Sequence, residues 1–255
     1  EINFSPTKIN KILITHWHGD HILGLPGLIQ TLATSNYQGT LNIFGPVNSK
    51  KYFDSINKMF INQNKISVKL IEIKKNGCFY KDVCLSIEAI YLNHTAPCLA
   101  YSIKENDKRK INLDYTKKFG LTKDPLLGKL QKGFTINYKG NKITPEKGTI
   151  IHKGRKITLI TDTSLCKEAI DISKDSDLLI CESTFTKELV NKAKEYQHLT
   201  SEQAAQIAKQ SKSKRLILTH ISQRYKLDEA KKIEYEAKKI FKNVIVAEDF
   251  LKVEI

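Results

Sequence analysis

Residues 11–21 read Lys-Ile-Leu-Ile-Thr-His-Trp-His-Gly-Asp-His, an apolar run followed at once by three imidazoles and a carboxylate. At neutral pH an imidazole is largely an unprotonated nitrogen ligand, and an aspartate supplies an anionic oxygen. In an extended or looping backbone, His16 and His18 can converge on one metal ion. The flexible glycine after them lets Asp20 and His21 converge on a second metal ion. The stretch therefore predicts a metal site directly after a buried strand, in preference to a solvated polar loop.

The length and composition of the chain predict a folded globular protein. Its 255 residues suffice for one large domain or two small ones with a sizeable core. Hydrophobic residues make up 40% and aromatic residues 8%, which excludes a disordered chain. The longest apolar runs are too short to cross a bilayer, so we expect no membrane partner.

The cysteines indicate a reducing compartment. The chain holds five of them (Cys78, Cys84, Cys98, Cys166 and Cys181), an odd number without any C-x-x-C spacing. This pattern favours reduced, partly buried thiols over a disulfide framework. We therefore expect a cytoplasmic protein.

The formal net charge of +15 is large for a chain of this size. Without a membrane anchor or an amphipathic basic helix, a polyanionic partner explains it most naturally, and nucleic acid is the first choice. The alternative is a lysine-rich solvated surface that serves no partner.

Much of this charge lies in one stretch. Residues 104–156 hold 15 Lys or Arg against 5 Asp or Glu, a local net charge of +10, together with six of the twelve glycines. Few large apolar residues occur there, so we expect little core and interpret the stretch as a projecting basic arm. The predicted organisation is a catalytic domain formed by residues 1–103 and 157–255, interrupted by this inserted arm.

Outside the arm, strand-like and helix-like patterns alternate, which predicts the α/β class. We expect strands at 11–15, 41–44, 68–73, 85–91, 99–104, 156–161, 178–181 and 215–219, and helices at 23–32, 49–62, 187–195, 201–209 and 227–241. The short segments 243–247 and 251–255 close the chain. Thr200 and Gln203 have capping-box spacing at the start of one of these helices.

Five ionisable residues each come directly after an apolar, strand-like run. They are His16, His94, Asp162, Glu182 and His220. In α/β folds the carboxyl ends of strands are where ligands and catalytic groups gather. We therefore predict that these side chains meet in one site, although a histidine taken alone is more often a hydrogen-bonded core residue.

The expected chemistry is metal-assisted hydrolysis of a phosphodiester. Two metal ions about 3.5–4 Å apart share a hydroxide whose conjugate acid has a pKa near 7. Asp162 is the candidate carboxylate to bridge them. The predicted first metal site is His16, His18, His94 and Asp162, and the predicted second is Asp20, His21, His220 and Asp162.

His198 is not needed to complete either predicted metal site, which leaves it for another role. Phosphodiester hydrolysis expels an alkoxide that is too basic to leave unprotonated, and a histidine is suited to protonate it near neutral pH. Glu182 would orient that imidazole and keep it charged, while Arg224 would hold a phosphate oxygen. The alternative for Glu182 and Arg224 is an ordinary surface ion pair.

Six motifs together resemble the tRNase Z family of the metallo-β-lactamase superfamily. They are Thr15-His-Trp-His-Gly-Asp-His21, Gly24-Leu-Pro-Gly-Leu28, Thr161-Asp-Thr163, Cys181-Glu-Ser-Thr-Phe185, His198-Leu-Thr-Ser201 and Leu218-Thr-His-Ile-Ser-Gln-Arg-Tyr225. Members of that family are endoribonucleases that remove the 3′ trailer of precursor tRNA and leave a 3′-hydroxyl. The resemblance implies an αββα sandwich of two mixed sheets with outer helices, and two zinc ions or, in their place, manganese or another divalent metal.

The resemblance also implies roles for individual residues. In the family, the residues that match His198, Glu182 and Arg224 serve phosphate binding and leaving-group protonation. The residue that matches Asp20 is a proton acceptor for the attacking water as well as a metal ligand.

The family carries a flexible arm that clamps the body of tRNA, generally across a homodimer. Residues 104–153 resemble it in position, charge and the stretch Asp124-Pro-Leu-Leu-Gly-Lys-Leu130, although the family more often has Gly-Pro where this chain has Asp-Pro. Phosphate contacts by lysines give affinity with steep salt dependence, and the shape of an A-form acceptor stem supplies selectivity. The lysines expected to bind RNA are Lys117, Lys118, Lys123, Lys129 and Lys132.

The first strands of the family, which include a Gly-Thr-Gly segment, have no counterpart here. The resemblance therefore implies an N-terminally truncated chain that keeps every metal ligand but has reduced stability and activity. Two alternatives remain open: a superfamily phosphodiesterase for small substrates, and a truncated RNA-binding protein without catalysis. The basic arm argues against the first, because a small substrate needs no such surface.

Overall fold

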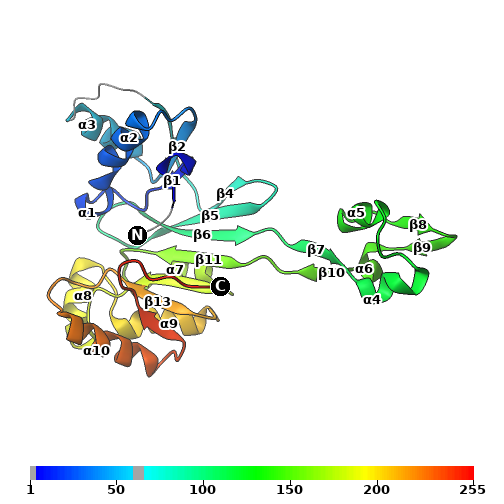
Figure 1. Cartoon of the computed structure of the whole chain (residues 1–255). Coiled ribbons are helices and arrows are strands. Elements are labelled where there is room, and N and C mark those ends of the chain that lie inside the picture. The colour runs from blue at the N-terminus through cyan, green and yellow to red at the C-terminus, as the bar shows by residue number, and fades with distance from the viewer. Residues whose placement is uncertain (1–3, 60–65) are drawn as a thin grey trace. The chain divides into compact units, whose positions relative to one another are not determined.

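The computed structural model describes residues 4–59 and 66–255, apart from the side chains of residues 227 and 228 (Figure 1). Two compact units divide the chain. The core unit comprises the described residues of 4–81, 86–103 and 156–255, and the inserted unit comprises Asp82–Leu85 and Lys104–Arg155. The described helices are all too short or too polar to span a bilayer.

Three parallel strands form the smaller sheet of the core unit, in the order β1-β2-β3. They are β1 (Lys11–Leu13), β2 (Thr40–Gly45) and β3 (Ser67–Glu72), preceded by the 3₁₀ turn η1 (Pro6–Lys8). The helices between these strands are α1 (Gly19–Ile22), α2 (Gly24–Thr34) and α3 (Ser49–Lys58). Because a helical crossover separates each pair of consecutive strands, the pairing is parallel, which differs from the mixed sheet expected here.

Apolar side chains of this sheet and its helices share one core. Leu32 of α2 and Leu41 and Ile43 of β2 are completely buried in it. Trp17, between two of the predicted metal ligands, packs against the same cluster, and its indole N–H donates a 2.7 Å hydrogen bond to Ser49 Oγ of α3. The core therefore anchors the loop that carries the histidine motif.

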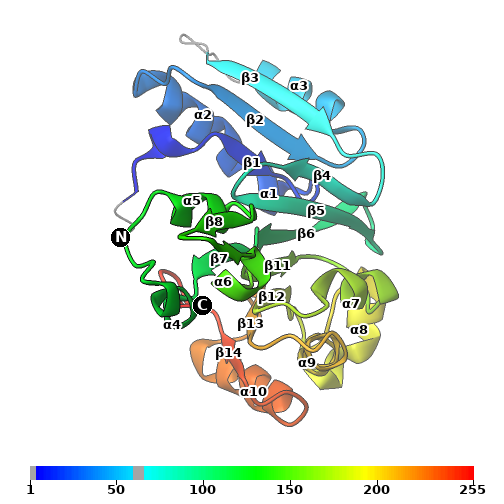
Figure 2. The same ribbon diagram turned by 90° about the vertical axis from the view of Figure 1, so that its right-hand side faces the viewer.

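Seven strands form the larger sheet, in the order β14-β13-β12-β11-β6-β5-β4. Their bounds are β4 (Gly77–Lys81), β5 (Leu85–Leu92), β6 (Cys98–Glu105), β11 (Lys156–Ile160), β12 (Leu178–Glu182), β13 (Leu216–Thr219) and β14 (Val244–Val246). The strands β11 to β14 pair in parallel, whereas β4 and β5 pair antiparallel. Figure 2 shows the strands following one another in this order. This sheet is mixed, as expected.

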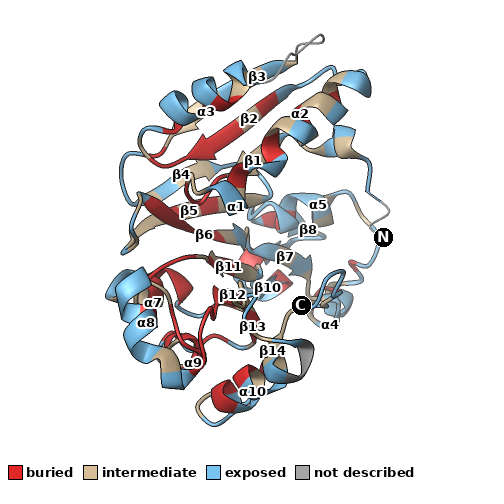
Figure 3. Cartoon of the chain, turned by 90° about the vertical axis from the view of Figure 1, so that its left-hand side faces the viewer, coloured by how far each residue is buried: buried red, intermediate tan, exposed pale blue. Residues whose placement is uncertain are grey.

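Helices lie against the parallel half of the larger sheet (Figures 2 and 3). They are α7 (Lys167–Ser173), α8 (Val190–Tyr196), which follows the 3₁₀ turn η3 (Lys187–Leu189), α9 (Ser201–Gln210) and α10 (Leu227–Lys238). The alanines of α9 face the sheet and are completely buried with Leu179 and Leu218. Their small side chains let the helix approach the strands closely. Thr200 and Gln203 form the predicted capping box at the start of α9.

The inserted unit contains two short antiparallel ribbons and four short helical segments. The strands are β7 (Lys108–Ile111) with β10 (Thr149–His152), and β8 (Ile136–Tyr138) with β9 (Asn141–Ile143). The helical segments are α4 (Leu113–Thr116), η2 (Lys117–Phe119), α5 (Leu126–Gln131) and α6 (Pro145–Gly148). The predicted arm at 104–156 covers nearly the same stretch as this unit.

The inserted unit has a small core of its own, which corrects the expectation of an arm that buries little. Leu121, Leu130, Ile136 and Ile143 are buried together although they are well separated in the sequence. A Cβ at Gly148 would lie 2.5 Å from Leu130 Cδ2, so a glycine is required where α6 meets this core. The apolar residues are few, but folding brings them to one place.

Asp124 accepts two hydrogen bonds at the start of α5. Its carboxylate Oδ1 accepts a 2.8 Å hydrogen bond from the Leu126 amide, and its carbonyl accepts one from Leu127 at 3.0 Å. These two bonds satisfy amide groups at the start of α5 that have no partner within the helix. Asp-Pro therefore begins a helix here.

The expected strands and helices of the core unit all occur, with bounds that differ by a few residues. The helix expected at 49–62 ends at Lys58, and residues 60–62 of that prediction lie outside the described residues. Three elements of the core unit, α1, β4 and α7, were not predicted. All five cysteines are described and free, and Cys98 and Cys181 are buried.

Candidate metal centre

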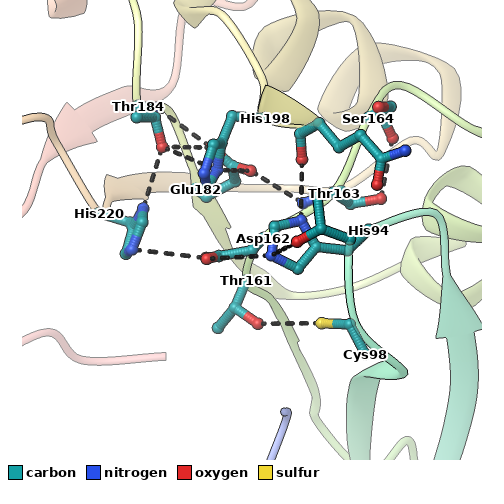
Figure 4. Close-up of polar contacts among 12 residues, drawn as sticks. His94, Cys98, Thr161, Asp162, Thr163, Ser164, Glu182, Thr184, His198 and His220 are labelled. Carbon is teal, nitrogen blue, oxygen red and sulfur yellow. Dashed lines mark hydrogen bonds and ion pairs between the residues drawn. The ribbon is translucent and has the colours of Figure 1, made fainter. Parts of the chain in front are cut away.

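The strands of the larger sheet deliver polar side chains to one edge. Asp162 follows β11, Glu182 ends β12 and His220 follows β13, and these three strands are parallel neighbours in the sheet. Their carboxyl ends therefore meet, as parallel pairing requires. His94 follows β5, and His198 lies between α8 and α9. Figure 4 shows these five side chains close to one another.

The first predicted metal site is assembled by the fold. His16, His18, His94 and Asp162 place one donor atom each within 4.8 Å of one another. His18 Nδ1 lies 3.1 Å from His16 Nε2 and 3.3 Å from His94 Nε2. Asp162 Oδ2 lies 3.5 Å from His16 Nε2 and 3.7 Å from His94 Nε2. Three nitrogens and one oxygen thus face a common point.

The second predicted site lies on the other side of Asp162. Asp20, His21 and His220 also bring donor atoms within 4.8 Å of one another. Asp20 Oδ2 is 3.3 Å from His21 Nε2 and 3.5 Å from His220 Nε2. Asp162 reaches this group too, with Oδ2 3.4 Å from His21 Nε2 and Oδ1 3.5 Å from His220 Nε2. A single carboxylate therefore contacts both groups.

The residues present fit a divalent metal. His21 Nε2 and Asp162 Oδ1 are buried without a hydrogen-bond partner among the described residues, although both face oppositely charged or polar groups. Buried polar atoms are rarely left without a partner, so this nitrogen and this oxygen fit a bound cation. The donor set of imidazoles and carboxylates suits zinc, manganese or iron.

Burial and neighbouring charges set the protonation of the cluster. Burial lowers the pKa of His16 to about 3, so its imidazole is neutral and available as a ligand. Burial alone would raise the pKa of Asp162, but the surrounding imidazoles, His21 first, hold it well below its usual range. The Asp162 carboxylate, 3.4 Å from His21 Nε2, in turn raises the pKa of His21. Asp162 is therefore an anion at neutral pH.

The non-ligating nitrogens of three histidines are held by the protein. His94 Nδ1 donates a 3.1 Å hydrogen bond to the backbone carbonyl of Gln197. His220 Nδ1 lies 2.9 Å from Thr184 Oγ1, and His16 Nδ1 lies 3.2 Å from Thr15 Oγ1. Such bonds orient a ring and leave the other nitrogen for a metal. His220 also has φ +56°, a backbone conformation that is uncommon outside glycine and found often at functional sites.

Glu182 holds the imidazole ring of His198 in place. Its Oε1 lies 3.0 Å from His198 Nδ1 and accepts a hydrogen bond from the Thr163 amide, and its Oε2 accepts one of 2.6 Å from Thr184 Oγ1. Glu182 is completely buried and does not pair with Arg224, so the surface ion pair considered above is excluded for it. Burial alone would lower the pKa of His198, but the hydrogen bond and charge of Glu182 raise it.

His198 and Arg224 are the other predicted site residues of the core unit. Asp162, His198 and His220 also bring donor atoms within 4.8 Å, so His198 faces the same pocket as the predicted ligands. Arg224 does not join that cluster: its guanidinium lies over the Phe185 ring, 5.0 Å from its centroid, and that ring is 6.1 Å from His198.

The five predicted RNA-binding lysines lie in the inserted unit. All are exposed, and none forms an ion pair with a carboxylate of the described residues. They are Lys117, Lys118, Lys123, Lys129 and Lys132.

Thr184 is a site residue that the sequence analysis did not single out. Its hydroxyl lies within hydrogen-bonding distance of Glu182, His198 and His220. The signal was present in the sequence, since a hydroxyl two residues after a strand-end glutamate lies at the same sheet edge. Which groups it meets depends on the neighbouring strand β13.

Comparison with protein families agrees with this geometry. A model described as "Metallo-beta-lactamase superfamily" matches residues 1–56, and one described as "Beta-lactamase superfamily domain" matches residues 133–221. A crystal structure of human tRNase Z, short form, superposes with a TM-score of 0.66 at 24% identity, covering 99% of this chain and 82% of that chain. The protein YhfI from Bacillus subtilis superposes with a TM-score of 0.63 at 19% identity, covering 96% and 77%. These structures confirm the expected metallo-β-lactamase fold.

Curated sequences identify the family. A protein named Ribonuclease Z from Nanoarchaeum equitans is 39% identical over 252 residues, which cover 97% of this chain and 77% of that protein. Ribonuclease Z from Enterococcus faecalis is 36% identical over 255 residues, covering 98% and 81%. Identity of this level over nearly the whole chain confirms the resemblance seen in the six motifs. The chain therefore belongs to the ribonuclease Z family of the metallo-β-lactamase superfamily.

Proposed function

We propose that this chain is a metal-dependent endoribonuclease that removes the 3′ trailer from precursor tRNA and leaves a 3′-hydroxyl on the tRNA. The observation that carries the proposal is the cluster in which two groups of metal donors share Asp162 and lie close to His198 with its buried partner Glu182. Hydrolysis of a phosphodiester needs these two parts, a metal site and a proton donor. The relatives named Ribonuclease Z support the choice of substrate.

Two zinc ions are the proposed cofactors, with manganese or another divalent metal as replacements. His16, His18 and His94 would hold the first, Asp20, His21 and His220 the second, and Asp162 would contact both. When bound, these metals would supply Lewis acidity toward the phosphate and lower the pKa of water near the cluster.

Two acidic residues would serve different parts of the reaction. The Asp20 side chain is 66% exposed, whereas Asp162 is buried. Burial alone would raise the pKa of Asp20, but His21 and its other partners lower it, so it is a carboxylate at neutral pH. Asp20 would thus accept a proton from the attacking water at the solvent side of the pocket.

His198 would protonate the leaving oxygen. As water attacks phosphorus, the bond from phosphorus to the 3′-oxygen of the tRNA breaks and that oxygen takes the electron pair. Because Nδ1 of His198 is engaged by Glu182, the proton would come from Nε2. The trailer keeps the phosphate at its 5′ end. Arg224, close to Phe185, would hold a non-bridging phosphate oxygen.

Binding of the tRNA body is assigned to the inserted unit. Its exposed lysines would contact phosphates, which gives affinity without sequence readout. We propose a homodimer in which the inserted unit of one protomer serves the site of its partner, as the family resemblance implies. We also propose that the protein acts in the cytoplasm, where free thiols such as those found here stay reduced.

The function is tested by incubating the purified protein with a trailer-bearing precursor tRNA, with and without a chelator, and mapping both cut ends. We expect one cut at the end of the acceptor stem, a 3′-hydroxyl on the tRNA, and loss of cleavage with chelator that added zinc or manganese restores. RNA binding without cleavage, at less than one metal ion per chain, would favour the non-catalytic alternative. Cleavage of bis(p-nitrophenyl) phosphate alone would favour the small-substrate phosphodiesterase.

Replacing the five arm lysines by glutamine is expected to raise KM for precursor tRNA by at least ~10-fold at 150 mM salt. The slope of log affinity against log salt should fall by about 0.9 for each lysine that contacts a phosphate. Hydrolysis of bis(p-nitrophenyl) phosphate should not change, because that substrate has no RNA body whose phosphates the lysines could bind. The matched control replaces five exposed lysines of the core unit, namely Lys50, Lys51, Lys58, Lys209 and Lys212. Equal effects of both sets would contradict a specific role for the inserted unit.

A further inference from the structure

A cavity of ≈ 400 Å³ lies beside His198 in the core unit. Asn93 and the pair Ser164 and Leu165 form one wall, after β5 and β11, and residues of α8 and α9 form the other. His198 is the one proposed catalytic residue in its lining, and no predicted metal ligand is part of it. Its size falls in the range of about 300–1,000 Å³ that is usual for small-ligand sites. The cavity is therefore large enough for a nucleoside.

The lining combines apolar surface with carboxamides. Leu165 and Val190 are 39% and 46% exposed, which leaves their apolar surface open to a ligand in the cavity. Asn93, Gln197 and Gln203 add amide donors and acceptors. A nucleobase has the complementary character, since its faces are apolar and its edges carry hydrogen-bonding groups.

Gln197 offers an acceptor that the protein itself does not use. Its Oε1 is buried and has no hydrogen-bond partner among the described residues. The residue is held in place because it ends α8 with φ +54° and its carbonyl accepts from His94. Gln203 is held as well, since its Oε1 accepts a 2.9 Å hydrogen bond from the Thr200 amide. The backbone of Gln197 and the carboxamide of Gln203 are thus fixed before any ligand arrives.

The position of His198 determines which nucleoside the cavity would take. In the proposed function His198 protonates the 3′-oxygen that leaves, and this oxygen belongs to the ribose of the last nucleotide that the tRNA keeps. That ribose must lie within hydrogen-bond reach of His198, which lines the cavity. The exposed ammonium of Lys194 at the same cavity suits the phosphate on the 5′ side of that ribose.

We propose that this cavity binds the nucleoside that carries the leaving 3′-oxygen, the last nucleotide retained by the tRNA. The proposal rests on the proposed function. The first nucleotide of the trailer, on the other side of the cut, then lies outside the cavity. Binding of the base here would place the 3′-oxygen at the proton donor before the bond breaks.

The test compares precursor tRNAs that lack one base, either at the nucleotide directly before the cut or at the nucleotide directly after it. With the unaltered protein, we expect removal of the base before the cut to lower kcat/KM about tenfold or more, since loss of one base contact is worth that much. Removal of the base after the cut should change kcat/KM less than twofold.

Two substitutions in the cavity lining should weaken the effect that removal of the base before the cut has on kcat/KM. Leu165→Trp fills the cavity, and we expect kcat/KM for the intact precursor to fall about tenfold. Removal of the base before the cut should then cause no further loss of kcat/KM. Gln197→Asn keeps the backbone carbonyl, and asparagine tolerates a positive φ. The shorter side chain withdraws the carboxamide from the cavity, so we expect this variant also to weaken the effect of removing the base before the cut. Met59→Trp is the matched control, because Met59 is 77% exposed in the core unit and away from the cavity lining.

The outcomes separate this proposal from the proposed function. A larger effect of the base after the cut, or equal effects of both bases, would overturn the assignment of the cavity while cleavage itself continues. An undiminished base effect in both cavity variants, with unchanged melting temperature, would also overturn it. Failure of the unaltered protein to cut any precursor would overturn the proposed function, and the cavity assignment with it.

Discussion

Asp162→Asn is expected to lower the metal content from the proposed two ions per chain to one or none and to reduce cleavage of precursor tRNA about 10³-fold or more. The carboxylate contacts His16, His21, His94 and His220, and it is the one acidic group shared by both donor sets. A neutral amide of the same shape removes the charge that attracts two cations. Metal-ion catalysis contributes several kcal/mol to such reactions, which corresponds to a change of this size.

Metal content by mass spectrometry and kcat/KM measured on the same preparation check this prediction. Asp171→Asn is the matched control, because Asp171 lies on α7 and pairs with Lys174 at 2.7 Å, and we expect it to change neither quantity. The near-equal shape of aspartate and asparagine should keep the fold, which circular dichroism verifies. An Asp162→Asn protein with two metal ions and normal turnover would refute the role of Asp162.

His198→Ala is expected to lower kcat for precursor tRNA by about 10² to 10⁴, the usual contribution of general acid catalysis. The same change should reduce hydrolysis of bis(p-nitrophenyl) phosphate less than tenfold, because p-nitrophenolate is a weak base and leaves without a proton. Metal content should stay the same, since neither predicted metal site needs His198. His152→Ala is the matched control, because His152 is exposed on β10 of the inserted unit.

Glu182→Gln distinguishes a proton donor from a metal ligand at position 198. The pKa of His198 is raised because the hydrogen bond and charge of Glu182 outweigh the effect of burial. The protonated imidazole is the active form, so the rate falls as pH rises through this pKa. Removing the carboxylate charge should therefore move the alkaline limb of the pH–rate profile to lower pH. An unshifted limb, or loss of one metal ion in His198→Ala, would indicate that His198 binds metal.

The sequence predicted most of the core unit because its strands are apolar runs that end in turn or ligand residues. β11, β12 and β13 were expected within one residue of their observed bounds. β4 was not predicted, because it is short and mostly half-exposed, and its pairing with β5 includes an irregular register. The core of the inserted unit was not predicted either, since Leu121 and Ile143 come together only after the chain folds back.

The sequence by itself determined the chemistry of the donors: imidazoles and carboxylates at the ends of apolar runs, and a hydroxyl and carboxamides close by. The tertiary structure decided which of them meet, because Asp162, Glu182 and His220 become neighbours only through the pairing of β11, β12 and β13. It also decided which nitrogen of His220 and of His94 is free, since Thr184 and the Gln197 carbonyl come from distant parts of the chain. Strand order and hydrogen-bond direction depend on long-range packing, which no local pattern of residues specifies.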